Sequence, residues 1–314
     1  MKRREKPQLF DVLIRNLALT LRPGTIETYQ VANRRFLNYI AVAYPEIQSP
    51  TQLRRDPHIL GYLRVLCEKT PPLKNSTRLS YLIHLRRLLL DSGCSEKLIL
   101  PVDFPRIDEC LPRSLSPEDD HLLDQELRKN PDLMHSGLLL LRATGMRIGE
   151  CVSLTTDCLR YLDHDQWALR VPLGKLHNER WIPVHEEIRK IIARILSLKN
   201  AFLPVVNRPS QNLLFPLPYR HAYCCELLRR QLAAVARRAG CSTHVTPHQL
   251  RHTFATEMVR AGMSLPALKE ILGHRSIRMT MRYIFITQID LQQQYLEARR
   301  KIASLHVLPK QPIS

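Results

Sequence analysis

The sequence predicts a mainly α-helical protein of two domains that contains one small β-hairpin sheet. Most of the 314 residues fall into segments in which apolar side chains recur three or four positions apart, as they do in amphipathic helices. A proline-rich stretch at residues 100–116 divides these segments into two groups. Alternating β-branched and aromatic residues occur at Gln166–Val171 and Arg180–Val184, on either side of a turn, which predicts the hairpin.

The first domain, residues 1–99, is predicted to be a small bundle of helices. The second helix is the clearest, because Thr25 can cap it, Pro45 stops it and large apolar side chains share one of its sides. These side chains are Ile26, Tyr29, Phe36, Leu37 and Ile40. The predicted helices are Leu9–Leu19, Thr25–Tyr44, Pro57–Glu68 and Asn75–Leu90.

Residues 100–116 are predicted to be an extended linker, since prolines interrupt a stretch that has no periodicity. The second domain, residues 117–314, begins with a helix for which Ser116 is the cap and Pro117 the first helical residue. A helix from Met134 to Ala143 follows, and Gly145 ends it. After the hairpin, helices are expected at Glu186–Leu198, Tyr219–Ala239, Pro247–Ala261, Leu265–Leu272, Ser276–Phe285 and Ile289–Leu305.

The chain is strongly basic, with 47 Lys and Arg against 29 Asp and Glu, a net charge of +18 and a pI of about 9.9. The excess is +7 in residues 1–112 and +11 in residues 113–314, so no basic tail carries it alone. Such a charge repels itself in a compact protein unless a polyanion neutralises it. Double-stranded DNA is therefore the predicted partner.

Cysteine usage and hydropathy indicate the compartment. The eight cysteines form no C-x-x-C pair and no zinc-like spacing with histidine, so we interpret them as free thiols in a reducing environment. The charged start MKRREKPQLF has no apolar core after it, and no run approaches about 20 apolar residues. We expect a cytoplasmic protein, nucleoid-associated when bound to DNA, without membrane contact.

Two basic motifs of the second domain are candidates for phosphate binding. Arg147 lies in TGMRIGE, where its planar fork of donors matches two phosphate oxygens and Glu150 can hold that fork in place. His248 and Arg251 lie in TPHQLRHTFAT, three residues apart and so on one side of a helix near its beginning. They combine a second fork with an imidazole that moves protons near neutral pH. We interpret the adjacent His252 as a packing or surface histidine.

Three further residues complete the candidate site. His274 lies in LGHRS, where Gly273 permits a tight turn that projects the imidazole as a hydrogen-bond donor. Tyr283 follows nine residues later in TMRYI, and this distance distinguishes it from the other tyrosines, with Tyr295 as the fallback. Lys175 lies in the predicted hairpin turn LGKLHNE, from which an ammonium can reach the minor groove of DNA and protonate a leaving oxygen.

In motif, order and spacing, this constellation resembles the tyrosine recombinases, the family of phage integrases and Xer-type recombinases. The resemblance implies the two-domain architecture of that family, with an N-terminal helical domain that clamps DNA and a C-terminal catalytic domain. The turn LHNER after Lys175 departs from many relatives, which have a second Gly or Lys there. The implied catalytic residues are Arg147, Lys175, His248, Arg251, His274 and Tyr283.

The reaction that the resemblance implies is a transesterification without metal, cofactor or ATP. Tyr283 attacks a scissile phosphate, expels a 5′-hydroxyl and becomes a 3′-phosphotyrosine, which keeps the bond energy for resealing. The two arginines and His274 stabilise the charge on the phosphate oxygens. His248 helps to remove the tyrosyl proton, and Lys175 protonates the leaving oxygen. The absence of a P-loop and of clustered carboxylates in the sequence agrees with this chemistry.

The expected partners are two recombination sites on double-stranded DNA, three further copies of the chain in a tetramer, and accessory recombination proteins. The segment from about Ile289 onward would dock on a neighbouring subunit or pack on its own domain. A role in a mobile element, in integration, excision or transposition, is favoured over a housekeeping Xer function. Two alternatives stay open: a type IB topoisomerase-like activity with the same groups, and a DNA-binding regulator without catalysis.

Overall fold

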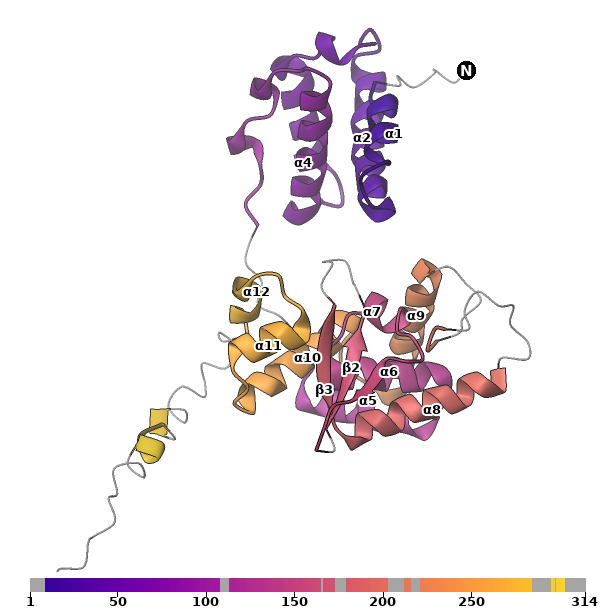
Figure 1. The fold of residues 1–314 in the computed structure, drawn as a ribbon. Helices are drawn as coiled ribbons and strands as arrows, with labels where there is room; N and C mark the ends of the chain where they lie inside the picture. The colour runs from indigo at the N-terminus through magenta and orange to yellow at the C-terminus, as the bar shows by residue number, and fades with distance from the viewer. Residues whose placement is uncertain are drawn as a thin grey trace, which may run out of the picture. The chain divides into compact units, whose positions relative to one another are not determined.

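The computed structural model describes residues 9–107, 113–164, 166–172, 179–202, 212–215, 221–283, 295–296 and 298–302. The chain divides into two compact units, Met1–Glu109 and Cys110–Ser314, each of which has a hydrophobic core of its own (Figure 1). Helices predominate in both, and the second unit also contains a small antiparallel sheet. The predicted fold class, mainly α with one small sheet, is confirmed.

The first unit is a bundle in which α2 and α4 lie side by side (Figure 1). The five side chains predicted for the apolar side of α2 are all buried. The predicted cap was wrong, because α2 begins at Pro23 after Arg22, where the fixed φ of proline starts the helix two residues before Thr25. The longer helices of this unit are α1 Asp11–Leu17, α2 Pro23–Ala43, α3 Leu60–Glu68 and α4 Asn75–Asp91.

Short helical turns complete the first unit, and one of them changes the picture of the predicted linker. Asp103 accepts hydrogen bonds from both terminal nitrogens of Arg55, at 2.6 and 2.9 Å, and from the backbone of Leu100 at 2.6 Å. The bond from Arg55 lowers the pKa of the Asp103 carboxyl. The first residues of the predicted linker are thus folded onto this unit. The turns are Pro50–Gln52, Arg55–Ile59, Glu96–Leu98 and Pro101–Asp103.

Helix α6 lies at the centre of the second unit, where it packs against α5, α8, α9 and α10. Its sequence LMHSGLLLLRAT is apolar on nearly all sides, which suits a helix enclosed by others. As predicted, it ends at Gly145, whose left-handed φ of 62° caps the helix. The helices are α5 Pro117–Lys129, α6 Leu133–Thr144, α7 Ile148–Val152, α8 Glu186–Phe202, α9 His221–Ala239, α10 Pro247–Arg260, α11 Leu265–Leu272 and α12 Ile277–Met281.

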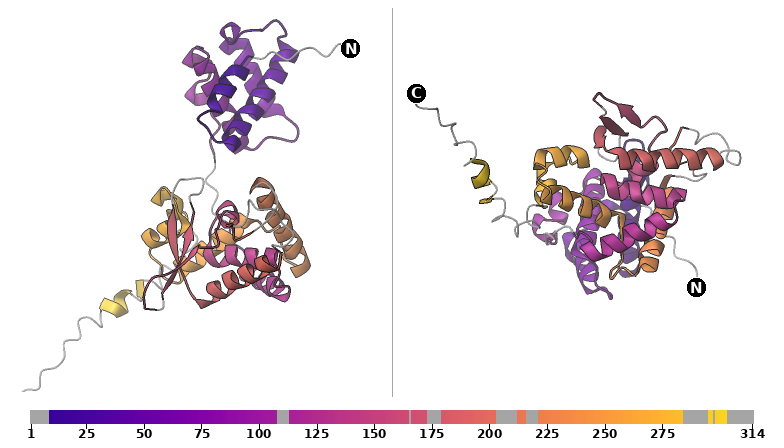
Figure 2. Two further views of the ribbon diagram at one scale, coloured as in Figure 1. Left: turned by 45° about the vertical axis from the view of Figure 1, so that its right-hand side comes forward. Right: turned by 90° about the horizontal axis from the view of Figure 1, so that it is seen from below.

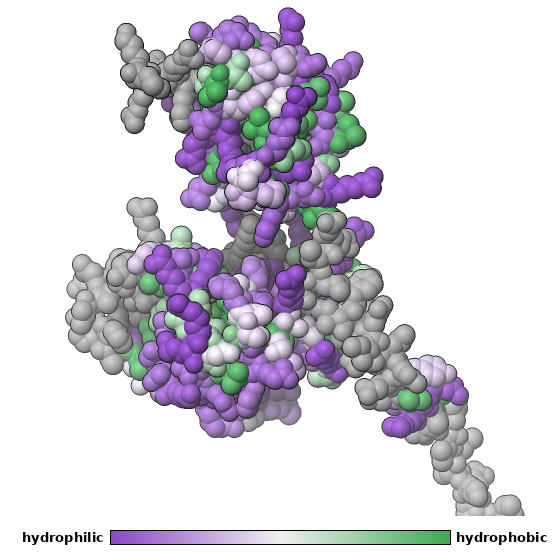
Figure 3. Space-filling model, turned by 180° about the vertical axis from the view of Figure 1, so that it is seen from behind, coloured by the Kyte–Doolittle hydropathy of each residue, from purple (hydrophilic) through white to green (hydrophobic). Residues whose placement is uncertain are grey.

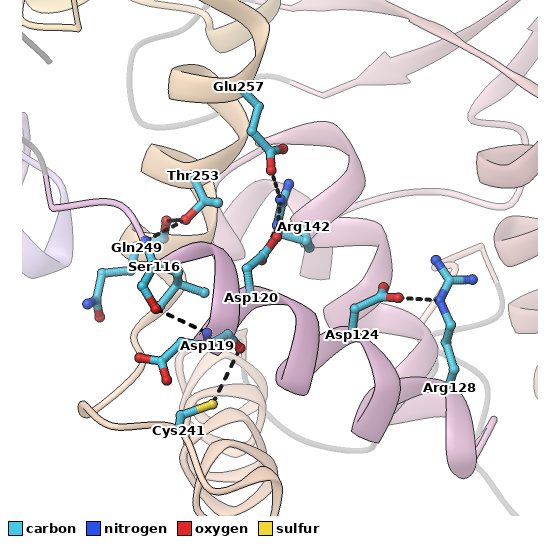
Figure 4. Close-up of polar contacts among 11 residues, drawn as sticks. Ser116, Asp119, Asp120, Asp124, Arg128, Arg142, Cys241, Gln249, Thr253 and Glu257 are labelled. Carbon is cyan, nitrogen blue, oxygen red and sulfur yellow. Dashed lines mark hydrogen bonds and ion pairs between the residues drawn. The ribbon is translucent and has the colours of Figure 1, made fainter. Parts of the chain in front are cut away.

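A polar network holds α10 against the first helices of this unit (Figure 4). Ser116 caps α5 as predicted, since its hydroxyl accepts a hydrogen bond from the backbone of Asp119 at 3.1 Å. Arg142 of α6 binds Asp120 of α5 at 2.6 and 2.7 Å and Glu257 of α10 at 2.6 Å. The beginning of α5 and the last turn of α6 therefore fix the position of α10.

The predicted hairpin is present as β2 Trp167–Val171 and β3 Arg180–Val184, in antiparallel register with Trp167 opposite Val184. A third strand that the sequence did not predict, β1 Leu159–Tyr161, pairs with the other edge of β2, so the order is β1-β2-β3. Three residues are too few to show an alternating pattern. Figure 2 shows the sheet at one edge of the second unit.

Two of the predicted C-terminal helices lie partly or largely outside the described residues. Of Ser276–Phe285, α12 covers Ile277–Met281, and of Ile289–Leu305 only residues 295–296 and 298–302 are described, as helix. On the face shown in Figure 3 hydrophilic side chains predominate, with hydrophobic ones between them in small groups. Within the described part of the chain, no helix has the length and apolar character needed to cross a membrane.

Replacing Gly145 by alanine should destabilise the second unit more than replacing Gly262. Both glycines have a positive φ, 62° and 89°, so each substitution costs about 1 kcal/mol or more in backbone strain. A Cβ at Gly145 would also lie 2.3 Å from the ring of Phe254, whereas nothing lies within 4 Å at Gly262. We expect an additional loss of about 1–3 kcal/mol in the free energy of unfolding.

Urea unfolding followed by tryptophan fluorescence measures this difference in the second unit, because both tryptophans, Trp167 and Trp181, belong to its sheet. Equal losses for Gly145→Ala and Gly262→Ala would contradict the expected clash with Phe254.

Candidate active site

Segments that are distant in the sequence meet in the second unit. They are the turn between α6 and α7, the first half of α10, the turn between α11 and α12, and the residue pair that follows α12. Together they bring five of the six sequence-predicted residues to one place: Arg147, His248, Arg251, His274 and Tyr283. The sixth, Lys175, lies outside the described residues.

Arg251 connects two of these segments through its buried guanidinium. Nη1 donates to the carbonyl of Gly145 at 2.8 Å, and Nη2 donates to the carbonyl of Leu272 at 2.6 Å. These carbonyls lie at the C-terminal ends of α6 and α11, where helix carbonyls lack partners within the helix and a cation is favoured. Burial and the positive charge of Arg147 lower the pKa of Arg251 to about 9, so the group stays charged near neutral pH.

Glu150 holds Arg147, as the sequence predicted. The carboxylate accepts from Nη1 of Arg147 at 2.8 Å and from its backbone nitrogen at 2.8 Å, which also caps α7. A second guanidinium binds the same carboxylate, because Arg180 of β3 donates to it at 2.8 and 3.2 Å. Burial of Glu150 opposes its ionisation, but the bonds from Arg180 and Arg147 outweigh burial and lower its pKa.

Arg180 also fixes the turn that carries His274. Its Nε donates to the carbonyl of Ile271 at 2.6 Å, near the end of α11. The next residue but one, Gly273, has a left-handed φ of 62°, and a Cβ there would lie 2.9 Å from Nη1 of Arg180. Glycine is therefore required at this position both by the turn and by the close approach of the guanidinium.

His274 is buried in this turn and is neutral. Burial, followed by the positive charges of Arg251, Arg147 and Arg180, lowers its pKa to about 3. Its Nδ1 lies 2.8 Å from the hydroxyl of Thr280 in α12. When that hydroxyl donates to Nδ1, the proton of the neutral ring is on Nε2, which leaves Nε2–H as a donor.

Tyr283 lies directly beyond α12 and is 2% exposed. Its ring is parallel to that of His274, with the centroids 6.4 Å apart. Its hydroxyl lies 2.9 Å from Nδ1 of His252. Burial raises the pKa of Tyr283, although the positive charges of Arg251 and Arg282 oppose this shift. The phenol is therefore protonated near neutral pH.

His248 and His252 lie on the same side of α10, with ring centroids 6.4 Å apart. The side chain of His248 is exposed at the rim of the cluster. The buried part of its surroundings and the charge of Arg251 lower its pKa. His252, interpreted from the sequence as a packing or surface residue, is half-buried and lies beside the Tyr283 ring, with the Tyr283 hydroxyl in hydrogen-bond distance. The two histidines are four residues apart, which puts them on one side of a helix, and this spacing is the signal in the sequence that both lie at the site.

Arg180 is a further residue of this cluster that the sequence did not indicate. In β3 the residues at positions 180, 182 and 184 face inward, so a charged residue at the first of them indicates a buried partner. That partner is Glu150. Arg180 and the partly exposed Arg147 thus share one carboxylate, while the buried Arg251 nearby is held by two backbone carbonyls. The arrangement favours an anion with several oxygens, such as a phosphate.

Comparisons with known proteins agree with this geometry. Residues 120–288, more than half of the chain, match the model of the phage integrase family. Tyrosine recombinase XerD of Listeria monocytogenes is 28% identical over 88% of this chain and 92% of its own. Transposase B from transposon Tn554 of Staphylococcus aureus is 27% identical over 86% of this chain and 44% of its own.

Among solved structures, the Tn1549 transposon integrase in complex with transposon right end DNA has a similar fold. Its TM-score is 0.65 at 18% identity, and the match covers 93% of this chain and 98% of that one. The match to the family model, together with this fold, decides the classification. The chain belongs to the phage integrase family and is a tyrosine recombinase, a DNA strand-transferring enzyme.

Proposed function

We propose that the chain cuts and rejoins DNA at a specific site by means of Tyr283, through a 3′-phosphotyrosyl intermediate. The observation that carries the proposal is the position of the Tyr283 hydroxyl, in a cluster with Arg147, Arg251 and His274. A tyrosine beside a phosphate-binding cluster is arranged for attack on phosphorus. The 5′-oxygen leaves, and the energy of the broken bond is kept in the phosphotyrosine.

Arg147 and Arg251 would bind the non-bridging oxygens of the scissile phosphate. Arg251 is held by backbone carbonyls and Arg147 by a carboxylate, so neither has to rearrange when a phosphate arrives. Preorganised cations of this kind stabilise the charge that builds up on the non-bridging oxygens in the transition state. His274 adds the Nε2–H of a neutral imidazole as a further donor. Because the ring is uncharged, it does not repel the neighbouring guanidiniums.

Two proton transfers complete the reaction. Lys175 is proposed to protonate the leaving 5′-oxygen, a role that rests on its place in the sequence between β2 and β3. The proton of Tyr283 needs an acceptor, for which the sequence favours His248. Among the described residues, the side chain within hydrogen-bond distance of the hydroxyl is that of His252.

The DNA partner and the assembly belong to the same proposal. Residues 1–99 would form a DNA-binding domain that acts with the catalytic domain, residues 117–314, through the linker at 100–116. Recombination joins two sites, which requires a tetramer on double-stranded DNA, with accessory proteins controlling direction. The likeness to a transposase and to a transposon integrase favours a mobile element as the biological context.

Tyr283→Phe should abolish covalent attachment to DNA and leave DNA affinity nearly unchanged, because the variant loses the attacking oxygen and keeps the ring. The matched control is Tyr295→Phe, which alters a tyrosine that is 63% exposed and should still form the adduct. The measurement is a denaturing gel after incubation with nicked duplexes from the DNA that flanks the gene.

An adduct formed by Tyr283→Phe would contradict the assignment of the nucleophile. Tight, salt-sensitive binding without any adduct from the wild-type protein would instead support a DNA-binding function without this chemistry.

The neutral state of His274 predicts a pH dependence of stability. In the unfolded chain a histidine takes up a proton near pH 6.5, whereas the folded protein resists it down to about pH 3. The unfolded state binds more protons in this window, so the free energy of unfolding falls as the pH falls through it. For this residue the slope is at most about 1.4 kcal/mol per pH unit.

His274→Gln, which cannot be protonated in this range, should reduce that slope. Urea unfolding of the second unit by tryptophan fluorescence at several pH values measures it. If the wild-type protein and the variant lost stability in parallel, His274 would not be protected from protonation in the folded state.

A further inference from the structure

The Tyr283 hydroxyl is enclosed, and its hydrogen-bond partner is a side chain of α10. Nδ1 of His252 lies 2.9 Å from the hydroxyl, and the two rings are 5.8 Å apart at an angle of 53°. Because Tyr283 is 2% exposed, bulk water has little access to compete for this contact. A group in direct contact with the attacking oxygen can influence its reactivity.

The surroundings of His252 keep its ring neutral before DNA binds. The groups that face it are His248 and Arg251 on its own helix, Arg282 and Tyr283 beyond α12, and His274 in the preceding turn. The charged ones among these are cations, and together with burial they lower the pKa of His252 to about 4. A neutral ring with its proton on Nε2 can accept the phenolic hydrogen bond at Nδ1.

Binding of DNA changes this balance. A phosphate held by Arg147 and Arg251 places a negative charge next to the same cations, which offsets their effect on His252. The basicity of the ring therefore rises when the substrate is in place. Proton transfer from the tyrosine to His252 is therefore less unfavourable on DNA than in the free protein.

We propose that His252 is a further catalytic residue, which accepts the proton of Tyr283 during attack on the scissile phosphate. The inference rests on the proposed function of Tyr283 as the nucleophile. His252 would then be the proton acceptor, the role for which the sequence favoured His248. The exposed ring of His248 suits contact with the DNA backbone instead.

Tyr283 and His252 exchange the same proton in cleavage and in resealing. In cleavage, the O–H bond of Tyr283 breaks and its proton moves to Nδ1 of His252, while a bond forms between the phenolic oxygen and phosphorus. The bond from phosphorus to the 5′-oxygen breaks, and that oxygen takes its electron pair and a proton from the general acid. In resealing, a 5′-hydroxyl attacks phosphorus, and the imidazolium of His252 returns the proton to the departing phenolic oxygen.

His252→Asn and His252→Ala separate proton transfer from positioning. The amide oxygen of asparagine can occupy nearly the position of Nδ1 and accept the hydrogen bond, but it cannot take the proton. We expect both variants to slow single-turnover formation of the covalent adduct by about 100-fold or more, with DNA affinity little changed. Unfolding curves by tryptophan fluorescence establish that each variant is folded.

His248→Asn, one turn away on the same helix, is the matched comparison. The inference is supported if His252→Asn is slower than His248→Asn by tenfold or more. It is overturned if His252→Asn reacts at nearly the wild-type rate, because a residue that only positions the tyrosine would be replaced by asparagine.

A duplex with sulfur in place of the bridging 5′-oxygen distinguishes the acceptor from the donor. A thiolate leaves without a proton, so a variant that lacks the general acid, such as Lys175→Ala, should recover on this substrate. His252→Asn should stay slow on it, and recovery would overturn the inference. The proposed function itself would fail if the wild-type protein formed no adduct, or formed one that Tyr283→Phe also forms. That outcome differs from failure of the inference about His252, in which His252→Asn forms the adduct at the normal rate.

Discussion

The shortage of negative charge around three arginines determines how this site is built. Arg147 and Arg180 share the carboxylate of Glu150, and Arg251 is held by carbonyls at two helix ends. Burying cations with so little compensation opposes folding, and the rest of the second unit must offset it. A phosphate would supply the missing charge, so the same imbalance that weakens the free protein favours the binding of an anion with several oxygens.

The cations also set the protonation states of the groups around them. Burial and these cations together hold His274 and His252 neutral, and the cations oppose the rise that burial causes in the pKa of Tyr283. A single change, the arrival of a phosphate, acts on all of these groups together. In the free chain the phenol of Tyr283 therefore stays protonated.

The sequence was sufficient for the fold class, for nearly all the helices and for the residues that meet at the site, because periodicity, caps and motifs are local. Glu150 was correctly expected to hold Arg147, three residues away. Contacts across long separations were not predictable in this way: Arg180 reaches Ile271, 91 positions on, and no period in the sequence indicates that bond. Strand β1 was missed for a related reason, since its three residues are defined by their pairing with β2.

The most direct test is to identify the residue that becomes linked to DNA. Mass spectrometry of the trapped adduct after trypsin would examine the segment YIFITQIDLQQQYLEAR, which contains both Tyr283 and Tyr295. The account predicts that the fragment ions place the nucleotide, attached through its 3′-phosphate, on Tyr283. A nucleotide on Tyr295, or on any residue outside this segment, would contradict it.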